Sequence, residues 1–467
     1  MLFNSFTFLL FFVLVYGIFW MLPNWAYRKN LLLGASYLFY AAWNPPYVVL
    51  LILSTLVDWW LAMRIGQAAT PARRRLLLFF SVACNLGMLS YFKYGSFLLD
   101  SFADAAAAFG WTVEYLDHSI LLPIGISFYT FASLSYTVDV YRGVIKSADS
   151  FRDYALFVSF FPHLVAGPIV KANILMPQIE KPVLPDANQV GWGFALFLLG
   201  LFAKLVLADA LFAPLVNGVY AHPDQYGVLE TWCAIISFSG QIYFDFCGYS
   251  LCAIGLAKSF GFYFPENFNF PYTATSFSDF WRRWHISLSS WLRDYLYISL
   301  GGNRHGVFRT YLALFATMLI GGLWHGASWM FVLWGALHGG FLVVERMCSG
   351  RSIAGLLTPA IRRGLVFLLV TLAWIPFRAG TTTQARDILA GLSGQHDAGE
   401  YLGLNEGMAL AVMAITVIGV TYLKDVSLDK LFASVRSNVQ TLVLASCLAA
   451  IFVFSGIGQN AFLYFQF

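Results

Sequence analysis

The amino-acid sequence predicts an all-α, polytopic membrane protein. Of its 467 residues, 59% are hydrophobic and 11% are charged, whereas soluble domains carry roughly 25% charged residues. Apolar runs of the length that crosses a bilayer, about 20 residues, recur along the chain. Basic residues gather between these runs, as they do in the cytoplasmic loops of membrane proteins. A surface with so few charges cannot face water on all sides, so we expect most of the chain to lie in a membrane.

The apolar runs define the expected helices in chain order. Neither a tandem repeat nor a low-complexity block interrupts them. Because some runs must be re-entrant or lie flat, we expect about 10–12 crossings. The candidate membrane segments are 6–22, 30–43, 46–62, 76–99, 118–138, 154–170, 190–213, 229–257, 307–323, 327–346, 363–378, 406–423 and 440–457.

The first run, MLFNSFTFLLFFVLVYGIFW, lacks the basic start and the cleavage site of a signal peptide, so we expect an uncleaved membrane helix. Arg28 and Lys29 follow this run, and three consecutive arginines, Arg73–Arg75, follow the third. The loop 100–117, by contrast, has four acidic residues and no basic residue. Because cytoplasmic loops are enriched in Lys and Arg, this pattern predicts a periplasmic N-terminus.

The middle third of the chain, 154–346, is where we expect a buried site. The loops on either side of it look cytoplasmic, so an even number of crossings must separate them, but five apolar runs lie between. The run FFPHLVAGPIVKANILMPQ, which carries His163, is the best re-entrant candidate because Pro162, Gly167 and Pro168 interrupt it. Irregular backbone at membrane depth is tolerated only inside protein or around a water-filled cavity.

The segment TSFSDFWRRWHISLSSWLRDYLYISLGGNR, residues 275–304, carries too many charges to span a bilayer. Ser276 and Asp279 have the spacing of a capping box, and Gly301 supplies the stop. Apolar residues repeat at helical spacing between them and include His285. We therefore expect one amphipathic helix at the membrane face, with its basic side toward water or phosphate and His285 in the apolar stripe.

His325 lies in the oily stretch GGLWHGASWMFVLWGALHGG, directly after Trp324. A neutral imidazole in a dry cavity can act as general base, taking the proton of a hydroxyl that attacks an acyl carbonyl. Desolvation keeps such a ring neutral and able to accept a proton. The alternative is a helix-packing histidine bonded to a carbonyl, but an intramembrane ionisable residue is functional by default. For His285, a functional role and simple bridging between water and apolar surface are equally supported.

Other polar residues of the middle third fit either a pathway or simple packing. His338 follows His325 by 13 residues, which on one straight helix is about 20 Å along the axis. The two rings could then not share a proton, so His338 is expected to be structural or to lie at a cavity mouth. Asp245 and His163 could line a pathway, but ion pairing is the favoured interpretation for the acidic residues, for instance Lys204 with Asp209.

Several other chemistries find no support in the sequence. The histidine spacings match no metal motif, and neither a GxSxG elbow nor a phosphate-binding loop occurs. The six cysteines include no CxxC pair, so they are expected to be buried apolar residues. The net charge of +4 and the lack of a basic, aromatic-rich soluble segment argue against nucleic acid as a partner.

Two motifs in this region resemble the membrane-bound O-acyltransferase (MBOAT) superfamily. They are FWRRWHISLSSWLRDYLYISLGGNR and GLWHGASWMFVLWGALHG. The likeness is to the bacterial branch that contains the membrane subunits of alginate and other polysaccharide O-acetylation systems. It extends to PIGISFYTFASLSYTVDVYRG, FFPHLVAGPIVKANILMPQ, QIYFDFCGYS and the closing FLYFQF, and so covers nearly the whole chain.

The resemblance implies a multi-helix bundle around a central funnel, in a bacterial inner membrane, with His325 as the catalytic histidine and His285 as a second active-site histidine. It implies an acyl thioester donor on the cytoplasmic side, acetyl-CoA for the acetylating branch, and no bound cofactor. Arg282, Arg283, Arg293 or Arg304 would then meet the anionic donor. Trp324, His338, Asp245 and His163 would line the tunnel or support it. Partners would be periplasmic acetyltransferases that modify the exopolysaccharide, an alginate- or cellulose-like glycan, and membrane lipid.

The expected layout is one membrane-embedded domain over 1–467, with N-terminal helices in 1–150, a catalytic core in 151–346 and C-terminal helices in 347–467. Two functions compete with polysaccharide O-acetylation: a lipid-modifying acyltransferase of the same superfamily, and a polysaccharide or acyl transporter. A transporter is expected to show inverted repeats with broken helices, and none is evident. Whether His325 acts as base or as transient acyl carrier stays open at this point.

Overall fold

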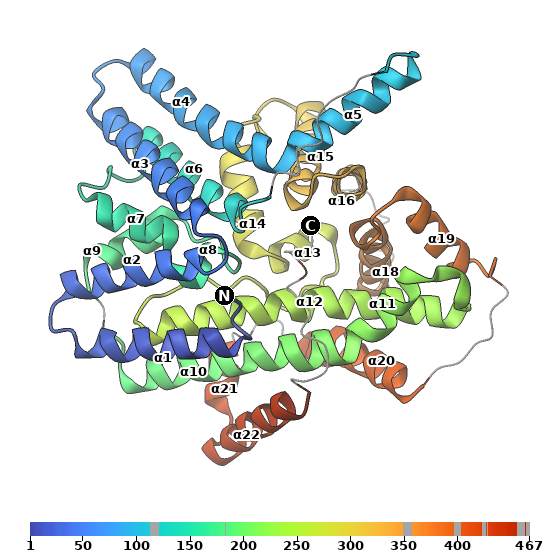
Figure 1. Cartoon of the computed structure of the whole chain (residues 1–467). Coiled ribbons are helices and arrows are strands. Elements are labelled where there is room, and N and C mark those ends of the chain that lie inside the picture. The colour runs from blue at the N-terminus through green and yellow to red at the C-terminus, as the bar shows by residue number, and fades with distance from the viewer. Residues whose placement is uncertain are drawn as a thin grey trace. The chain divides into compact units, whose positions relative to one another are not determined.

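The computed structural model describes residues 1–112, 121–182, 184–348, 357–396, 403–422, 426, 428–454 and 463. All regular elements within these residues are helices (Figure 1). The closing FLYFQF motif, apart from Leu463, and the acidic residues at 114 and 117 lie outside the described residues. The chain divides into two compact units, the first made of Met1–Phe194 and Ala253–Pro265, the second of Ala195–Cys252 and Glu266–Phe467.

The first unit is built from helices that precede residue 181. They are α1 (Phe6–Met21), α2 (Trp25–Ala41), α3 (Pro46–Gln67), α4 (Pro71–Leu89), the π-helical η1 (Ser90–Tyr94), α5 (Gly95–Ala108), α6 (Ile126–Arg142), α7 (Phe151–Ser159), α8 (Phe161–Leu164) and α9 (Ala172–Glu180). Two long helices, α10 (Ala187–Phe202) and α12 (Val228–Ser259), contribute residues to both units.

The second unit contains the remaining elements. They are the π-helical η2 (Ala203–Phe212), α11 (Ala213–Ala221), η3 (Pro223–Gln225), η4 (Pro271–Thr273), α13 (Phe277–Arg283), α14 (Ile286–Trp291), the π-helical η5 (Leu292–Tyr297), α15 (Val307–His325), α16 (Trp329–Cys348), α18 (Pro359–Arg378), α19 (Thr382–Leu392), α20 (Leu404–Val417), η6 (Gly419–Tyr422), α21 (Leu428–Ser434) and α22 (Ser437–Phe454).

Eight helical stretches of the described residues are long and apolar enough to cross a membrane. The prediction of an all-α, polytopic membrane protein is therefore confirmed. Four of the expected segments form helices shorter than 18 residues and are not among them: α1 has 16 residues, α2 and α6 have 17 each, and the run at 154–170 is broken into α7 and α8. The eight stretches are Pro46–Gln67, Pro71–Ala108, Ala187–Ala221, Val307–His325, Trp329–Cys348, Pro359–Arg378, Leu404–Thr421 and Ser437–Phe454.

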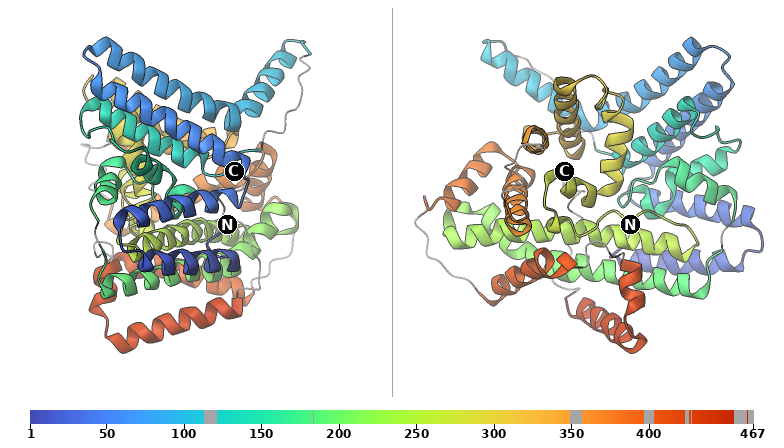
Figure 2. Two further views of the ribbon diagram at one scale, coloured as in Figure 1. Left: turned by 60° about the vertical axis from the view of Figure 1, so that its left-hand side comes forward. Right: turned by 180° about the vertical axis from the view of Figure 1, so that it is seen from behind.

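In the first unit, α3 and α4 pack side by side (Figures 1 and 2). A buried carboxylate, that of Asp58, lies between them. Asp58 on α3 accepts hydrogen bonds from the hydroxyl of Ser81, at 2.7 Å, and from the amide of Asn85, at 2.8 and 2.9 Å, both on α4. Hydrogen bonds between helices replace the hydrophobic driving force that is missing inside a membrane. This contact therefore fixes the register of the two helices.

The broken run at 154–170 confirms that Pro and Gly interrupt this segment. Helix α7 ends at Ser159, α8 spans only Phe161–Leu164, and the next helix begins at Ala172. Residues 153–170 are nevertheless buried throughout. Gly167 has φ +115°, and a Cβ there would meet the side chain of Ala253 at 3.0 Å. The irregular backbone is thus covered by protein, as such backbone must be at membrane depth.

In the second unit, close backbone contacts between helices require glycine. A Cβ added to Gly200 on α10 would lie 2.5 Å from the carbonyl oxygen of Gly248 on α12. A Cβ added to Gly322 on α15 would lie 2.4 Å from the carbonyl oxygen of Phe331 and 2.9 Å from Cα of Gly335, both on α16. Small residues at helix interfaces allow this approach. As a result α15 and α16 form a tight helical hairpin.

We expect Gly200→Ala to destabilise the protein, because the new methyl group meets backbone atoms that cannot rotate away. The cost of such overpacking is about 1–3 kcal/mol. Thermal unfolding of the detergent-solubilised protein measures the effect. Gly191→Ala on the same helix is the matched control, since a Cβ there has no atom within 4 Å. Equal unfolding temperatures for the two variants would contradict the packing described.

Candidate active site

Helix α15 carries His325 as its last residue, and the chain leaves the helix at Gly326 in an extended conformation. A Cβ at Gly326 would lie 2.1 Å from the ring of Phe331, so only glycine fits between His325 and α16. The imidazole is 5% exposed. Its ring centre lies 5.0 Å from those of Trp324 and Trp334 and 5.4 Å from that of Phe377. The sequence-predicted histidine is therefore enclosed by aromatic rings.

The expectation of one continuous helix over 275–304 is wrong. The predicted cap is present, since the hydroxyl of Ser276 accepts from the backbone N–H of Asp279 at 3.0 Å. Helix α13, however, ends at Arg283, and α14 begins only after His285, which has φ +44° and ψ 53°. This left-handed conformation is disfavoured for residues other than glycine. His285 therefore lies at a sharp kink, where its side chain is fully buried.

The kink brings His285 next to His325. The two imidazole ring centres lie 6.4 Å apart with an interplanar angle of 58°. Phe246 of α12 contacts the edge of His285 at a centre distance of 4.5 Å, and Trp324 lies 6.1 Å from it. The structure thus joins the two histidines that the sequence motifs singled out, in a dry and aromatic environment.

Asn267 holds the kink, and the sequence reasoning missed it. Its side-chain oxygen accepts from the backbone N–H of Ser287 at 3.2 Å and from the Ser287 hydroxyl at 2.8 Å. Nδ1 of His285 lies 3.2 Å from the same oxygen. The Asn267 amide nitrogen donates to the hydroxyl of Ser250 at 3.1 Å. The only sequence signal is the stretch NFNFPY, residues 267–272, in which Asn267 and Asn269 alternate with aromatic residues.

Burial lowers the pKa of His285 to about 3, because the charged imidazolium loses its hydration. The ring is therefore neutral over the whole physiological range of pH. His163 belongs to the first unit, where its ring packs against Phe264 at 5.3 Å and Phe160 at 6.2 Å. Burial lowers the pKa of His163 to about 4.

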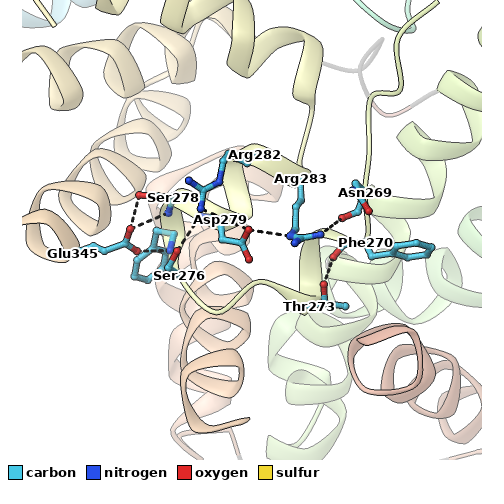
Figure 3. Close-up of polar contacts among 10 residues, drawn as sticks. Asn269, Phe270, Thr273, Ser276, Ser278, Asp279, Arg282, Arg283 and Glu345 are labelled. Atoms are coloured by element: carbon cyan, nitrogen blue, oxygen red, sulfur yellow. Dashed lines mark hydrogen bonds and ion pairs between the residues drawn. The ribbon is translucent and has the colours of Figure 1, made fainter. Parts of the chain in front are cut away.

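The four arginines of the predicted donor site differ in their surroundings. Arg282 and Arg293 have side chains that are 71% and 66% exposed, and Arg304 is exposed as well. The side chain of Arg283, by contrast, is only 12% exposed, and its Nε donates to Asp279 at 3.0 Å. Arg283 also contacts the backbone oxygen of Asn269 at 3.4 Å (Figure 3). We therefore assign Arg283 to holding α13 in place.

Figure 3 shows a second anchor of α13, the carboxylate of Glu345 near the end of α16. It accepts from the backbone N–H of Phe277 at 2.5 Å and from that of Ser278 at 3.2 Å. It also accepts from the Ser278 hydroxyl at 2.5 Å. A negative charge at a helix start satisfies backbone donors that the helix itself leaves unpaired. The start of α13 is thus bonded to α16, and its end is bonded to the loop at Asn267–Asn269.

The other candidate residues have packing contacts. His338 on α16 is fully buried, with its ring 5.1 Å from Trp281 and 4.8 Å from Trp334. Since α15 ends at His325, the two histidines lie on different helices, and the ring of Trp334 contacts both.

Asp245 pairs with Lys204 and accepts from the backbone N–H of Leu463 at 3.1 Å. Lys204 also binds Asp209 at 2.8 Å, which confirms the predicted ion pair. Among the residues that the structure describes, no cluster of three His, Cys, Asp or Glu could hold a metal ion.

The sequence pattern of the membrane-bound O-acyltransferase family (MBOAT) matches residues 144–367. The histidine pair and both of its motifs lie within this range. The chain belongs to this family, and it is a membrane O-acyltransferase.

Its relatives include the probable alginate O-acetylase AlgI of Pseudomonas aeruginosa, 44% identical over 81% of this chain and 72% of that protein. The AlgI of Azotobacter vinelandii is 44% identical over 81% of this chain and 75% of its own length. The peptidoglycan O-acetyltransferase of Helicobacter pylori is 34% identical over 95% of this chain and 93% of its own length.

We expect Glu345→Ala to lower the free energy of unfolding by about 1–2 kcal/mol, because the start of α13 loses its acceptor. Denaturant unfolding in detergent measures this. Asp387→Ala is the matched control, since that carboxylate is 41% exposed and only 3.7 Å from Arg386, and such surface pairs contribute about 0–1 kcal/mol. Equal losses in the two variants would refute an anchoring role for Glu345.

The lowered pKa of His285 predicts a stability that depends on pH. The unfolded chain takes up a proton at this histidine below about pH 6.5, whereas the folded protein does so only near pH 3. The stabilisation is therefore present above about pH 6.5 and is lost as the pH falls toward 3. His285→Gln should reduce the slope of the unfolding free energy between about pH 5 and 6 by up to about 1.4 kcal/mol per pH unit. Denaturant titrations at several pH values measure it, and unchanged slopes would contradict the burial of a neutral ring.

Proposed function

We propose that this chain takes an acetyl group from a thioester donor, acetyl-CoA, on the cytoplasmic side of a bacterial inner membrane and passes it across for O-acetylation of an exopolysaccharide. The acceptor is an alginate-like glycan, and a periplasmic acetyltransferase completes the transfer. The observation that carries the proposal is the buried pair His285 and His325, 6.4 Å apart, in a chain that is 44% identical to alginate O-acetylases.

The environment of the pair suits acyl transfer. Both rings are shielded from water by aromatic side chains, so a reactive thioester at this point would be protected from hydrolysis. In the reaction a hydroxyl oxygen bonds to the acyl carbon, the C–S bond breaks, and the hydroxyl proton moves to the departing thiolate. His325 can serve this step as a proton acceptor. As a transient carrier it would instead take the acyl group onto a ring nitrogen as the C–S bond breaks, and the hydroxyl oxygen would then take it as the C–N bond breaks.

Arg282, Arg293 and Arg304 are the residues that we assign to the donor. All three side chains are exposed. Arg282 precedes His285 along the chain, and Arg293 and Arg304 follow it. Phosphate groups of a donor such as acetyl-CoA form charge-assisted hydrogen bonds with arginine. In this arrangement the donor binds on the cytoplasmic face of the membrane, and the N-terminus of the chain is periplasmic.

A second candidate function is O-acetylation of peptidoglycan. The peptidoglycan O-acetyltransferase of Helicobacter pylori matches 95% of this chain and 93% of its own length, more of both than the alginate O-acetylases do. Both functions require the same transfer across a membrane and differ in the glycan that receives the acetyl group. The identity of the acceptor therefore has to be measured separately from the transfer itself.

We expect His325→Ala to reduce acetyl transfer by about 10²–10⁴-fold, the usual contribution of a positioned acid or base, while the protein still inserts and accumulates. Loss of radiolabelled acetyl from acetyl-CoA with the purified protein measures the transfer. His222→Ala is the matched control because His222 is exposed. Equal consumption by wild type and His325→Ala would contradict the enzymatic role of the pair.

The acceptor is tested in bacteria that make alginate but lack their own O-acetylase. Expression of this chain should restore acetyl groups to alginate when a periplasmic acetyltransferase is present. Acetyl found on peptidoglycan instead supports the second candidate. A preference for long-chain donors would point to a lipid-modifying enzyme, and export without acetylation would point to a transporter.

A further inference from the structure

We propose that Asn267 is a positioning residue that holds His285 as the tautomer protonated on Nδ1, so that Nε2 receives the proton of the hydroxyl to which the acyl group is transferred. This inference rests on the proposed acyl transfer. It assigns the acceptance of the hydroxyl proton to His285. The role of His325 then concerns the acyl group rather than this proton.

The orientation of the Asn267 amide follows from its neighbours. A backbone N–H can only donate a hydrogen bond, and that of Ser287 points at the Asn267 atom assigned as oxygen, at 3.2 Å. A flipped amide would place two donors against each other. The hydroxyl of Ser287, at 2.8 Å, and that of Ser250, at 3.1 Å, fit the same orientation. The atom that faces His285 is therefore the oxygen.

The tautomer of His285 follows in turn. Nδ1 lies 3.2 Å from this oxygen, and an oxygen of an amide can only accept. Nδ1 must therefore carry a hydrogen, and since the ring is neutral, Nε2 carries none. The hydrogen bond made by one ring nitrogen thus decides what the other can do.

The backbone around the kink keeps this arrangement rigid. The Asn267 backbone oxygen accepts from the N–H of Ile286 at 2.9 Å, and Asn269 donates to the backbone oxygen of Arg283 at 2.9 Å. The loop before η4 is therefore bonded to the chain on both sides of His285. Rotation of the imidazole about its side-chain bonds would break the contact with Asn267, so the ring and the amide fix one another.

The contacts that the structure describes around the ring of His285 come mostly from uncharged groups. Phe246 comes from α12, Trp324 and His325 come from α15, Asn267 comes from the loop before η4, and Ser287 comes from α14. Of these five named groups, His325 is the titratable one. The ring centres lie 6.4 Å apart in protein rather than in water, so a change of charge at one imidazole changes the proton affinity of the other.

The 6.4 Å between the ring centres matches one oxygen that is hydrogen-bonded to both rings. Hydrogen bonds of about 2.8 Å to a nitrogen of each ring are compatible with ring centres this far apart. A hydroxyl between them donates to the bare Nε2 of His285. As its oxygen bonds to the acyl carbon and the C–S bond breaks, the proton passes to Nε2 and then to the thiolate. Negative charge that develops on the reacting oxygen raises the affinity of the ring for the proton at that moment.

The test is the pH dependence of acetyl transfer by purified Asn267→Asp. A carboxylate beside Nδ1 favours the imidazolium, so the ring becomes charged at a higher pH and can no longer accept a proton. We expect the acid limb of the kcat profile to move up by about one pH unit or more. Asn267→Ala should lose about 10–100-fold in kcat with KM for acetyl-CoA unchanged.

Thr371→Val is the matched control. It removes another buried side-chain hydrogen bond of the second unit, 3.0 Å long, to Ser239, and it should leave the pH profile in place. A loss of kcat in Asn267→Asp by the same factor at every pH would overturn the inference, because loosened packing alone has that effect.

A second measurement needs only the wild-type protein. Nitrogen NMR of protein labelled with ¹⁵N-histidine, with His285→Gln to assign the signal among the eight histidines, distinguishes the two neutral tautomers. A protonated Nδ1 and a bare Nε2 support the inference, and the reverse order refutes it. This readout does not depend on acetyl-CoA, so it separates failure of the inference from failure of the proposed function.

Discussion

The side-chain oxygen of Asn267 is the contact on which the histidine pair depends. His285 has a left-handed backbone, which costs a residue with a Cβ about 1–2 kcal/mol. Such strain persists only where the surrounding structure holds it. Asn267, 1% exposed, binds both the imidazole and the first residues after the kink. An amide buried without these partners would itself be costly, so the loop and the kink stabilise one another, and the kink turns His285 inward.

Backbone contact between α15 and α16 is the second constraint. Gly322 faces the backbone of Phe331 and Gly335, and Gly326 lies beneath the ring of Phe331. The hairpin can therefore close at the level of His325, and Trp334 reaches the imidazole at 5.0 Å. Glu345 at the far end of α16 then binds the start of α13. Helix α16 thus helps to position both histidines. Its Trp334 packs against His325, and its Glu345 caps the start of α13, the helix that leads to His285.

Local patterns predicted most of the fold and part of the site. Hydropathy located the long apolar helices, and Ser276 formed its cap, because both signals depend on neighbours in sequence. The ion pair of Lys204 and Asp209 was predictable for the same reason. The kink at His285 was not, because the helical spacing of apolar residues continues through it and the left-handed residue is imposed by Asn267, 18 positions upstream. The proximity of His285 and His325 followed only from resemblance to a family, since no short-range pattern links residues 40 positions apart.

Two neighbouring imidazoles are useful to an acyltransferase only if their surroundings differ. His285 is fully buried and has an amide partner on Nδ1, whereas His325 lies at a helix end among Trp324, Trp334 and Phe377. Titratable groups whose environments separate their proton affinities can take separate roles in one reaction. If both rings were free to exchange tautomers, each would compete for the same proton and neither would present a fixed lone pair. A neutral amide partner avoids this, and unlike a carboxylate it leaves the ring uncharged until a substrate arrives.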